Sequence, residues 1–433
     1  MFPFVRKYAT APGMVVRGWT VRLEPDPAQA ARFQRDCGAR RFAYNWAVTQ
    51  MGEAFDHGNA TGKWDGAVWS AYSLRKRWNQ VKVDVAPWWA ENSKEAYATG
   101  ITDAVTALRN WHASKTGKRV GPPMQFPRRK KKSRDRLRCT YTTGALRVEG
   151  PRIVVLPRVG QVRTSENLRS LWRHVRRGSG RLLAATVAER AGHWFVSLRL
   201  EIAAPWQPPP RVSTVGVDVG IGNHLLVVMR PDGSVEGKVR NPRPLRGSLA
   251  ELRKATRSLS RKSEGSRRWR QARRRLGRAH ARVENIRNNA LHQATTRLAK
   301  THGQIVIEDL GVRQLARGLR SHRKGWADAA AGKMRRQLTY KADWYGCELW
   351  IADRYYPSSK TCSACGLVNA TLTLSERSWT CQGCGVSHDR DENAGVNLAC
   401  LPASWAEAAS DGKTAPVRRV AVNRVNHPGR VAA

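Results

Sequence analysis

Two stretches in the first half of the chain alternate between apolar and polar residues. The alternation from Val15 to Leu23 predicts a strand, and Asp26-Pro27 marks the start of a helix just after it. Strand-like runs return from Leu146 onwards and end in two longer runs joined by a turn at Ala191-Gly192. These runs predict a small β-barrel made of residues 1–30 and 115–205.

Between these β segments the spacing of apolar residues becomes helical. Ala98, Ile101, Val105 and Leu108 recur every three or four residues, so residues 31–114 are expected to form a helical insert. The segment PWQPPPR, residues 205–211, holds four prolines and cannot continue a sheet. It predicts a linker.

Beyond the linker, strand patterns alternate with helical ones. TVGVDVG (214–220), QIVIEDL (304–310) and CELWIADRYY (347–356) have the apolar character of buried strands. A long helix between the first two has one apolar seam, formed by Trp269, Ala272, Leu276, Ala279, Val283, Ile286 and Ala290. The fold class is therefore multidomain, α+β in the first half and α/β in the second. Periodicity is weak after Leu401, so residues 401–433 are expected to be a flexible tail.

The charge of the chain points to a polyanionic partner. Lys and Arg number 77 against 33 Asp and Glu, a formal net charge of +44, and such an excess favours nucleic acid without specifying any reaction. Two clusters are candidate phosphate contacts: Arg128, Arg129, Lys130, Lys131 and Lys132 in a loop, and Arg267, Arg268, Arg270, Arg273, Arg274, Arg275, Arg278 and Arg282 around the helical seam. A solvated charged face is the alternative, but eight arginines exceed what solubility needs.

The location is expected to be cytoplasmic. No window of about 18 apolar residues occurs, which argues against a transmembrane helix and a membrane partner. The start of the chain lacks the apolar core of a signal peptide. Four of the eight cysteines form Cys-x-x-Cys pairs, a metal pattern typical of a reducing compartment.

Two strands carry isolated acids. In TVGVDVG the pleat places Asp218 opposite the valines, between Gly216 and Gly220. A lone Asp there is costly to bury unless it is paired or binds metal. The flanking glycines are expected to leave space for an ion and a phosphate. The alternative is an Asp at a strand end that hydrogen-bonds a turn.

The second acid comes from QIVIEDL. Ile305 and Ile307 share one face of this strand and Glu308 lies on the other, so Glu308 and Asp309 cannot both face one site. Glu308 is the candidate because it lies one residue deeper in the strand. The alternative is that Glu308 pairs with an arginine.

A third acid follows from HDRDENAGVN, residues 388–397. Ala394, Leu398 and Leu401 recur at helical spacing, so a helix is expected to start near Asp391, where its dipole favours a carboxylate. Three carboxylates suit two Mg²⁺ ions about 4 Å apart, which activate water and stabilise the leaving oxygen of a phosphodiester. Asp389 and Glu392 are secondary candidates.

The most specific motif is a pair of cysteine knuckles. Cys362-x-x-Cys365 and Cys381-x-x-Cys384 supply four thiolates for a closed, structural Zn²⁺ site. An iron site needs a further reason to be preferred, and a redox role is a poor match to two copies. His388 is expected to be a polar loop residue and not a ligand.

As a set, VGVDVG, IVIEDL, YPSSKTCSACG, CQGCG and HDRDENAGVNL resemble the TnpB transposon-encoded nucleases and their descendants, the compact type V CRISPR effectors. RFAYNWAV and RRQLTYKADWYG follow in family order, so the resemblance covers nearly all of residues 15 to 400. It implies an RNase H-like, RuvC-type nuclease domain (206–360 and 386–400) with a zinc ribbon (361–385) inserted before its last motif. It also implies a wedge β-barrel domain (1–30 and 115–205) around a helical recognition insert (31–114).

The resemblance implies RNA-guided cleavage of double-stranded DNA next to a short motif, in which guide pairing reads the target. The family's three magnesium-binding acids fall on Asp218, Glu308 and Asp391. The partners would be a guide RNA and target DNA in a prokaryotic cytoplasm, acting at the nucleoid, with self-association left open. The helical segment Met51 to His112 is longer than expected for TnpB and favours a CRISPR effector slightly. A repeat–spacer array beside the gene would indicate the effector, and transposon ends would indicate TnpB.

Two other functions remain open. One is a guided DNA-binding protein that represses transcription without cutting, which the complete acid trio disfavours. The other is a transposon-associated protein that joins DNA strands, because RNase H-like folds also support strand transfer.

Overall fold

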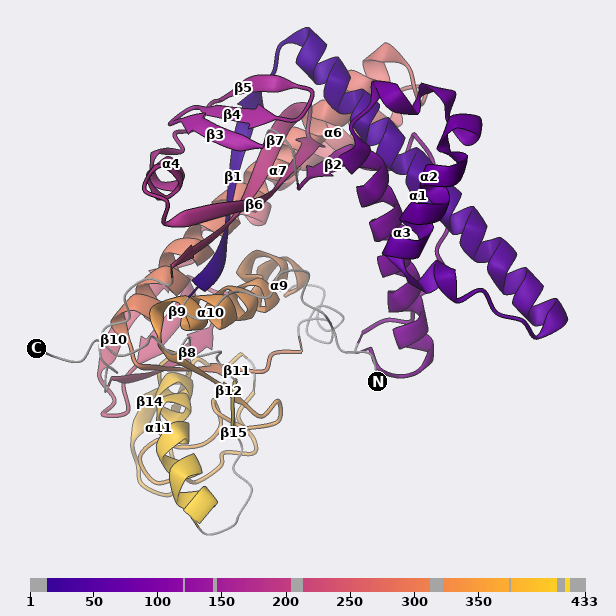
Figure 1. The fold of residues 1–433 in the computed structure, drawn as a ribbon. Helices are drawn as coiled ribbons and strands as arrows, with labels where there is room; N and C mark the ends of the chain where they lie inside the picture. Colours follow the sequence, from indigo (N-terminus) through magenta and orange to yellow (C-terminus); the bar gives the residue numbers. More distant parts are fainter. Residues whose placement is uncertain are drawn as a thin grey trace, which may run out of the picture. The chain divides into compact units, whose positions relative to one another are not determined.

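The chain forms two compact units. The structure, a computed structural model, describes residues 14–119, 121–142, 146–203, 213–311, 322–373, 375–410 and 417–420. The units are Met1–Ala203 and Ala204–Ala433 (Figure 1). The predicted linker at 205–211 lies outside the described residues. No described helix is long and apolar enough to cross a membrane.

The first unit combines a sheet with three longer helices. In chain order its elements are β1 (Met14–Glu24), α1 (Pro27–Thr61), η1 (Gly66–Trp69), α2 (Ala71–Val85), η2 (Pro87–Glu91), α3 (Lys94–Lys115), β2 (Arg138–Tyr141), β3 (Arg147–Gly150), β4 (Ile153–Leu156), β5 (Gly160–Thr164), α4 (Arg169–Arg176), β6 (Gly180–Arg190) and β7 (His193–Ala203).

The predicted strand–helix start and hairpin are confirmed. Asp26 caps α1 by accepting from the backbone N–H of Gln29, whose side chain accepts from the N–H of Asp26. Ala191 and Gly192 connect β6 to β7 with φ of 53° and 84°. Positive φ at both central residues is what a tight hairpin turn requires.

The predicted barrel is wrong in one respect, because the described strands form an open sheet. Its order is β2-β6-β7-β1-β5-β4-β3, and the end strands β2 and β3 do not pair with each other. Both end strands have only four residues. Side chains of α3 cover the β2 edge instead: Thr99 donates to the carbonyl of Thr140 (3.1 Å) and Glu95 accepts from the N–H of Thr142 (3.2 Å). Backbone polar groups at this edge thereby have hydrogen-bond partners, and the sheet does not close into a barrel.

The second unit is built around one mixed sheet. Its elements are β8 (Thr214–Val219), β9 (His224–Met229), β10 (Val235–Arg240), α5 (Pro244–Gly247), α6 (Leu249–Ser260), α7 (Arg267–Thr301), β11 (Gln304–Glu308), α9 (Arg323–Ala329), α10 (Ala331–Tyr345), β12 (Glu348–Ala352), β13 (Ser378–Thr380), β14 (Ser387–Asp389), α11 (Arg390–Ser410) and β15 (Val417–Arg419).

The three strands predicted for this half are confirmed as β8, β11 and β12. The order of the main sheet is β10-β9-β8-β11-β12-β15, and β8, β11 and β12 are parallel. The small sheet of β13 and β14 belongs to the cysteine segment.

Helices cover both faces of the main sheet. On one face Val217 and Ile307 pack with Leu298 of α7 and Leu338 of α10. On the other, Val306 and Trp350 pack with Leu398 of α11. Figure 1 shows α10 and α11 on opposite sides of the sheet. The alternation of Ile305 and Ile307 with Val306 and Glu308 is therefore as predicted.

Glycines allow α11 to approach the sheet closely. A Cβ at Gly216 would lie 2.0 Å from the carbonyl oxygen of Gly395 and 2.5 Å from the nitrogen of Ala399. A Cβ at Gly395 would lie 2.4 Å from Cγ of Met229. The prediction that Gly216 leaves space for an ion and a phosphate is wrong, because backbone atoms of α11 fill that space.

The predicted flexible tail is wrong for residues 401–410 and 417–420. Helix α11 continues to Ser410, and β15 joins the sheet beside β12, with Ala352 opposite Val417 and Trp350 opposite Arg419. An edge strand pairs through its backbone, so side-chain periodicity does not reveal it. Residues 421–433 lie outside the described part.

Candidate functional site

Asp218 and Glu308 lie side by side at the ends of two neighbouring parallel strands. The register pairs Val306 with Gly216 and Ile307 with Val217, so the next residues along the strands are Glu308 and Asp218. Both point to the α11 face. Carboxyl ends of parallel strands are common places for binding sites.

Asp391 comes to the same place from the first turn of α11. Asp389 accepts hydrogen bonds from the backbone N–H groups of Asp391 and Glu392, both at 3.0 Å, and so caps the helix. Glu392 forms an ion pair with Lys238 at 2.5 Å. Asp389 and Glu392 thus have structural partners, whereas Asp391 lines the same cleft as Asp218 and Glu308.

The three acids line one open cleft of about 820 Å³. Two more acids, Asp309 and Asp353, also line it. Its basic and aromatic side chains are Arg354, Lys360, Arg377, Arg390, Trp326, Tyr355 and Tyr356. Tyr355 is 83% exposed, although its neighbour Tyr356 packs against the apolar cluster between the sheet and α11. The Asp353 carboxylate fixes the turn by accepting from the N–H of Tyr355 at 2.9 Å.

Burial and mutual repulsion disfavour ionisation of these acids. Burial raises the pKa of Asp218 well above its ordinary value, and the charges of Glu308 and Asp391 raise it further. Burial also raises the pKa of Glu308, against the opposing effects of the Ser358 hydroxyl and Arg390. Crowded carboxylates of this kind are stabilised by a bound cation.

Glu308 and Asp309 both line the cleft, contrary to the prediction that they cannot face one site, but they have different partners. Asp309 follows the end of β11 and forms ion pairs with Arg335, Arg354 (3.3 Å) and Arg418 (3.7 Å). Glu308 instead accepts a hydrogen bond from the Ser358 hydroxyl. The arginine-paired acid is therefore Asp309.

Sequence reasoning missed several residues around the acids. Arg390 is 9% exposed and donates to Ser359 (3.2 Å) and to the carbonyl of Thr373 (2.5 Å). Arg377 lies 3.4 Å from Asp391. Asn393 and Asn397 also bond the segment before Cys362. The only signal in the sequence was that Asn393 and Asn397 stand four residues apart on a helix.

The donor set suits hard divalent cations, because it consists of carboxylate oxygens beside a basic cleft. Among the described residues, four cysteines are the one group of three or more candidate ligands within 4.8 Å of one another. The three carboxylates do not meet that spacing.

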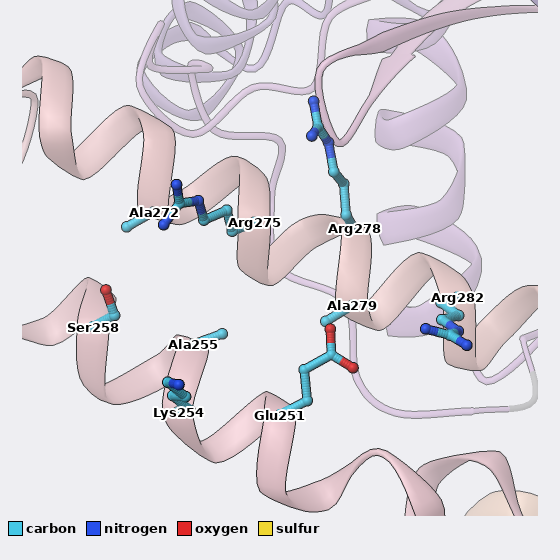
Figure 2. Close-up of a pocket in the computed structure, with 9 residues that line it drawn as sticks. All are labelled: Glu251, Lys254, Ala255, Ser258, Ala272, Arg275, Arg278, Ala279 and Arg282. Carbon is cyan, nitrogen blue, oxygen red and sulfur yellow. The ribbon is translucent and has the colours of Figure 1, made fainter.

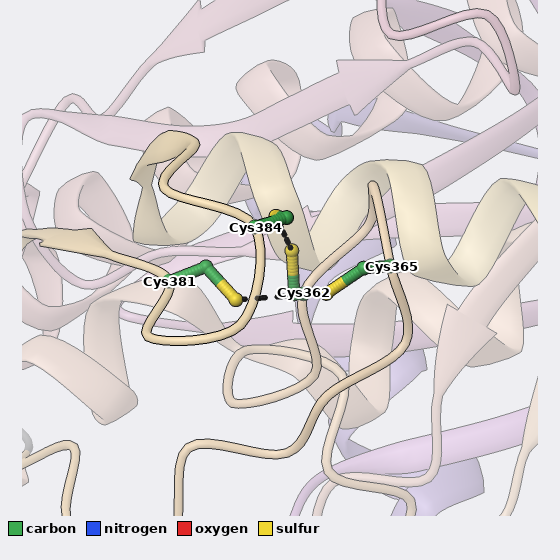
Figure 3. Close-up of side chains that lie close together, drawn as sticks. All are labelled: Cys362, Cys365, Cys381 and Cys384. Atoms are coloured by element: carbon green, nitrogen blue, oxygen red, sulfur yellow. Dashed lines mark hydrogen bonds between the residues drawn. The ribbon is translucent and has the colours of Figure 1, made fainter.

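The four thiols predicted as a metal site come together (Figure 3). The Sγ atoms of Cys362 and Cys384 are 3.6 Å apart, as are those of Cys365 and Cys381. Each knuckle has the same backbone pattern: Cys362 accepts from Gly366 and Cys381 accepts from Gly385, both at 2.9 Å. Four converging thiols match the tetrahedral preference of Zn²⁺.

The prediction that His388 is a loop residue is wrong, because His388 lies on β14 beside this cluster. Its Nε2 is 3.0 Å from Sγ of Cys362, and its ring lies 5.0 Å from the ring of Trp379. It is placed to hydrogen-bond a thiolate, and the four cysteines complete the ligand set without it.

All eight arginines predicted around the α7 seam are exposed. None of them forms an ion pair with another described residue. Ala272, Ala279 and Val283 of the seam are buried as expected, whereas Ile286 is exposed. Arg275, Arg278 and Arg282 border a groove of about 480 Å³ between α6 and α7. Figure 2 shows Glu251 of α6 reaching toward Ala279, while Arg278 extends away from α6.

The predicted basic loop cluster, residues 128–132, contains both exposed and packed side chains. Arg128, Arg129, Lys131 and Lys132 are exposed. Lys130 instead places its ammonium 3.7 Å from the ring centre of Tyr44, and its backbone forms two hydrogen bonds with the Asn45 side chain. Lys130 therefore anchors the loop to α1.

Three family models match the chain. One described as "Probable transposase" matches residues 197–318, one described as "Cas12f1-like, TNB domain" matches residues 332–398, and one described as "Helix-turn-helix domain" matches residues 14–59. Over the last range the structure has β1 followed by the single helix α1.

Similar proteins match over most of their length. A Mycobacterium tuberculosis H37Rv protein named "Putative RNA-guided DNA endonuclease" is 44% identical, over 89% of this chain and 87% of its own. A Streptomyces pristinaespiralis protein with that name is 33% identical, over 92% of each chain. The solved structure of a Cas12f1–sgRNA–target DNA complex matches with a TM-score of 0.51 and 13% identity, over 89% of this chain and 99% of that one. The last likeness concerns the fold alone.

The raised pKa of Asp218 predicts that its charge destabilises the metal-free fold. Its folded-state pKa exceeds the unfolded value, so stability is lost as pH rises through the folded-state pKa. In magnesium-free buffer containing zinc, Asp218→Asn should raise Tm at pH 8 by about 2–4 °C, and the gain should shrink at about pH 4. Thermal unfolding monitored by circular dichroism measures this difference. Asp232→Asn, on an exposed turn, is the control. A Tm that is unchanged or lower in Asp218→Asn contradicts the electrostatic argument.

Proposed function

We propose that this chain, which belongs to the TnpB-like family of RNA-guided DNA endonucleases, uses a guide RNA to select double-stranded DNA and hydrolyses its phosphodiester bonds. The observation that carries the proposal is the meeting of Asp218, Glu308 and Asp391. These residues come from β8, β11 and α11, far apart in the sequence, and line one cleft.

In this proposal the three carboxylates hold two Mg²⁺ ions. When bound, such ions activate the attacking water and stabilise the leaving oxygen. Arg354, Lys360 and Arg377 lie along the cleft and would bind the phosphates of the strand being cut. The exposed ring of Tyr355 offers a surface on which an unpaired base can stack. A single DNA strand is therefore the favoured substrate of the cleft.

The finer domain assignment is also a proposal. The mixed sheet with acids on β8 and β11 supports an RNase H-like, RuvC-type domain over 206–360 and 386–400. The four thiols and the strands β13 and β14 support a structural Zn²⁺ ribbon over 361–385. The sheet of the first unit would be the wedge domain, and α1 to α3 the recognition insert.

The exposed α7 arginines are proposed to bind RNA phosphates. They number eight, are unpaired among the described residues and border a groove. Arg128, Arg129, Lys131 and Lys132 are proposed as a second phosphate contact. Lys130 contributes less, because its ammonium already lies over Tyr44.

The alternatives are weaker. Repression without cutting requires no intact acid trio, and all three acids are present and line one cleft. Strand transfer uses the same kind of site, so joined products in an assay with transposon ends would favour it. The long helical segment does not separate a CRISPR effector from TnpB. The relatives that match about nine tenths of the chain are named only as putative RNA-guided DNA endonucleases.

Neutral replacements of the acids should abolish cutting and preserve binding. With a guide RNA and matched DNA in Mg²⁺, we expect Asp218→Asn, Glu308→Gln and Asp391→Asn each to lower the cleavage rate by at least about 10³-fold. Gel analysis of cleavage and a separate binding titration measure the two steps. Glu392→Gln, whose side chain pairs with Lys238, is the control and should keep most activity. Equal cutting by wild type and Asp218→Asn refutes the assignment.

The α7 arginines should control the salt dependence of RNA binding. Replacing Arg273, Arg274 and Arg275 with Ala should weaken guide binding and reduce the slope of log affinity against log salt by about 2. Filter binding at several salt concentrations measures the slope. Removal of three exposed α4 arginines, Arg169, Arg173 and Arg176, is a control with the same loss of charge. Unchanged RNA affinity in the α7 variant excludes these contacts.

A further inference from the structure

A short segment between β12 and the first cysteine connects one acid of the site to the cysteine cluster. Ser358 is 3% exposed, and its hydroxyl donates to the Glu308 carboxylate. Three residues later, Thr361 directly precedes Cys362 of the cysteine cluster. One stretch of four residues therefore joins the second acid to the proposed zinc ribbon.

Two asparagines of α11 hold this segment. Nδ2 of Asn397 donates to the carbonyl oxygens of Ser358 (2.8 Å) and Thr361 (2.6 Å). Nδ2 of Asn393 donates to the Thr361 carbonyl (2.7 Å), and its Oδ1 accepts from the N–H of Ser363 (2.9 Å). Residues four apart lie on one helix face, so both amides reach the same segment.

These hydrogen bonds lie in a region where water does not replace them easily. Asn393 is 2% exposed and Asn397 is 8% exposed. Ser358 and Thr361 belong to no named strand or helix, so the amides take the place of a regular backbone partner. Both carbonyls accept from both asparagines, because Nδ2 of Asn393 also donates to the Ser358 carbonyl at 3.4 Å. Loss of the Asn397 amide would leave Ser358 with only this longer hydrogen bond, so the segment would be held less firmly.

We propose that Asn393 and Asn397 are positioning residues for the nuclease reaction, which hold the Ser358 hydroxyl on Glu308 and so fix the second acid relative to the other two. The proposal rests on the function proposed above. Asn393 also lies two residues after Asp391 on the same helix, so the asparagine clamp ties Glu308 and Asp391 to one rigid element.

The clamp also gives the cysteine ribbon a role in cleavage. Thr361 and Ser363 flank Cys362, so the clamp holds the first knuckle and the Ser358 segment at the same time. A change in the ribbon that moves Thr361 would therefore also move Ser358 and, with it, the hydroxyl that holds Glu308.

A double-mutant cycle tests whether Asn397 acts through Ser358. The guide-loaded wild type, Ser358→Ala, Asn397→Ala and the double variant are compared for kcat, KM for target DNA and the Mg²⁺ concentration at half-maximal rate. Ser358→Ala removes only the hydroxyl and leaves its carbonyl in place. Each single variant should lower kcat by about 10- to 100-fold, with KM for DNA unchanged and a higher Mg²⁺ requirement.

Non-additivity is the decisive result. If Asn397 works through Ser358, the double variant should be no worse than the poorer single variant within about twofold. Multiplied losses would show two independent effects and overturn the proposal. An Asn397→Ala protein with wild-type kcat would overturn it as well. A loss confined to KM for DNA would assign the asparagine to binding and also contradict it.

Asn369→Ala is the matched control. Asn369 lies in the ribbon, and its side chain caps a local turn at Thr371 without reaching Ser358 or Thr361. It should keep wild-type kcat. Zinc content and guide binding, measured for every variant, separate loss of the fold from loss of positioning. Ser358→Ala retains every backbone contact and serves where Asn397→Ala fails to fold. A wild-type protein that cuts no guided target refutes the proposed function instead, independently of the cycle.

Discussion

The close contact between β8 and α11 is the constraint on which the acid site depends. Gly216 and Gly395 meet where no side chain could be accommodated: a Cβ on Gly216 would lie 2.0 Å from the Gly395 carbonyl. This approach brings the first turn of α11, and with it Asp391, to the ends of β8 and β11. A larger residue at either glycine would move the helix away from the sheet. The third acid is therefore placed by backbone packing, and the asparagine clamp and the Asp389 cap refine its position.

The cost of this arrangement is electrostatic. Burial and neighbouring carboxylates raise the pKa of Asp218, so the folded chain holds charges that it would be more stable without. Arg390 and Arg377 offset part of the repulsion. A pair of divalent cations would offset more. The crowding of carboxylates that destabilises the metal-free fold is therefore the same feature that would bind the ions. The proposed zinc ribbon differs, because its four thiol sulfurs all lie within 4.8 Å of one another.

Periodicity and pleat were sufficient to predict the elements that place the site. The alternation in TVGVDVG and QIVIEDL assigned Asp218 and Glu308 to one face, and the helical spacing after Asp391 set the start of α11. Long-range backbone contacts were invisible to the same reasoning. Gly216 was interpreted as space for a ligand because nothing in a strand pattern shows the approach of Gly395, 179 residues later in the sequence. The pairing of β15 with β12, the open sheet of the first unit and the role of Ser358 have the same origin.

In the proposed site, three carboxylates brought together by β8, β11 and α11 hold two divalent cations. Electron paramagnetic resonance titration of Mn²⁺ into the RNA-free, zinc-loaded protein tests it without relying on cleavage. We expect about two bound ions per chain in the wild type, with weakened binding of both in Asp218→Asn. Absence of bound Mn²⁺ at millimolar concentration, or the same binding after Asp218→Asn, would contradict it.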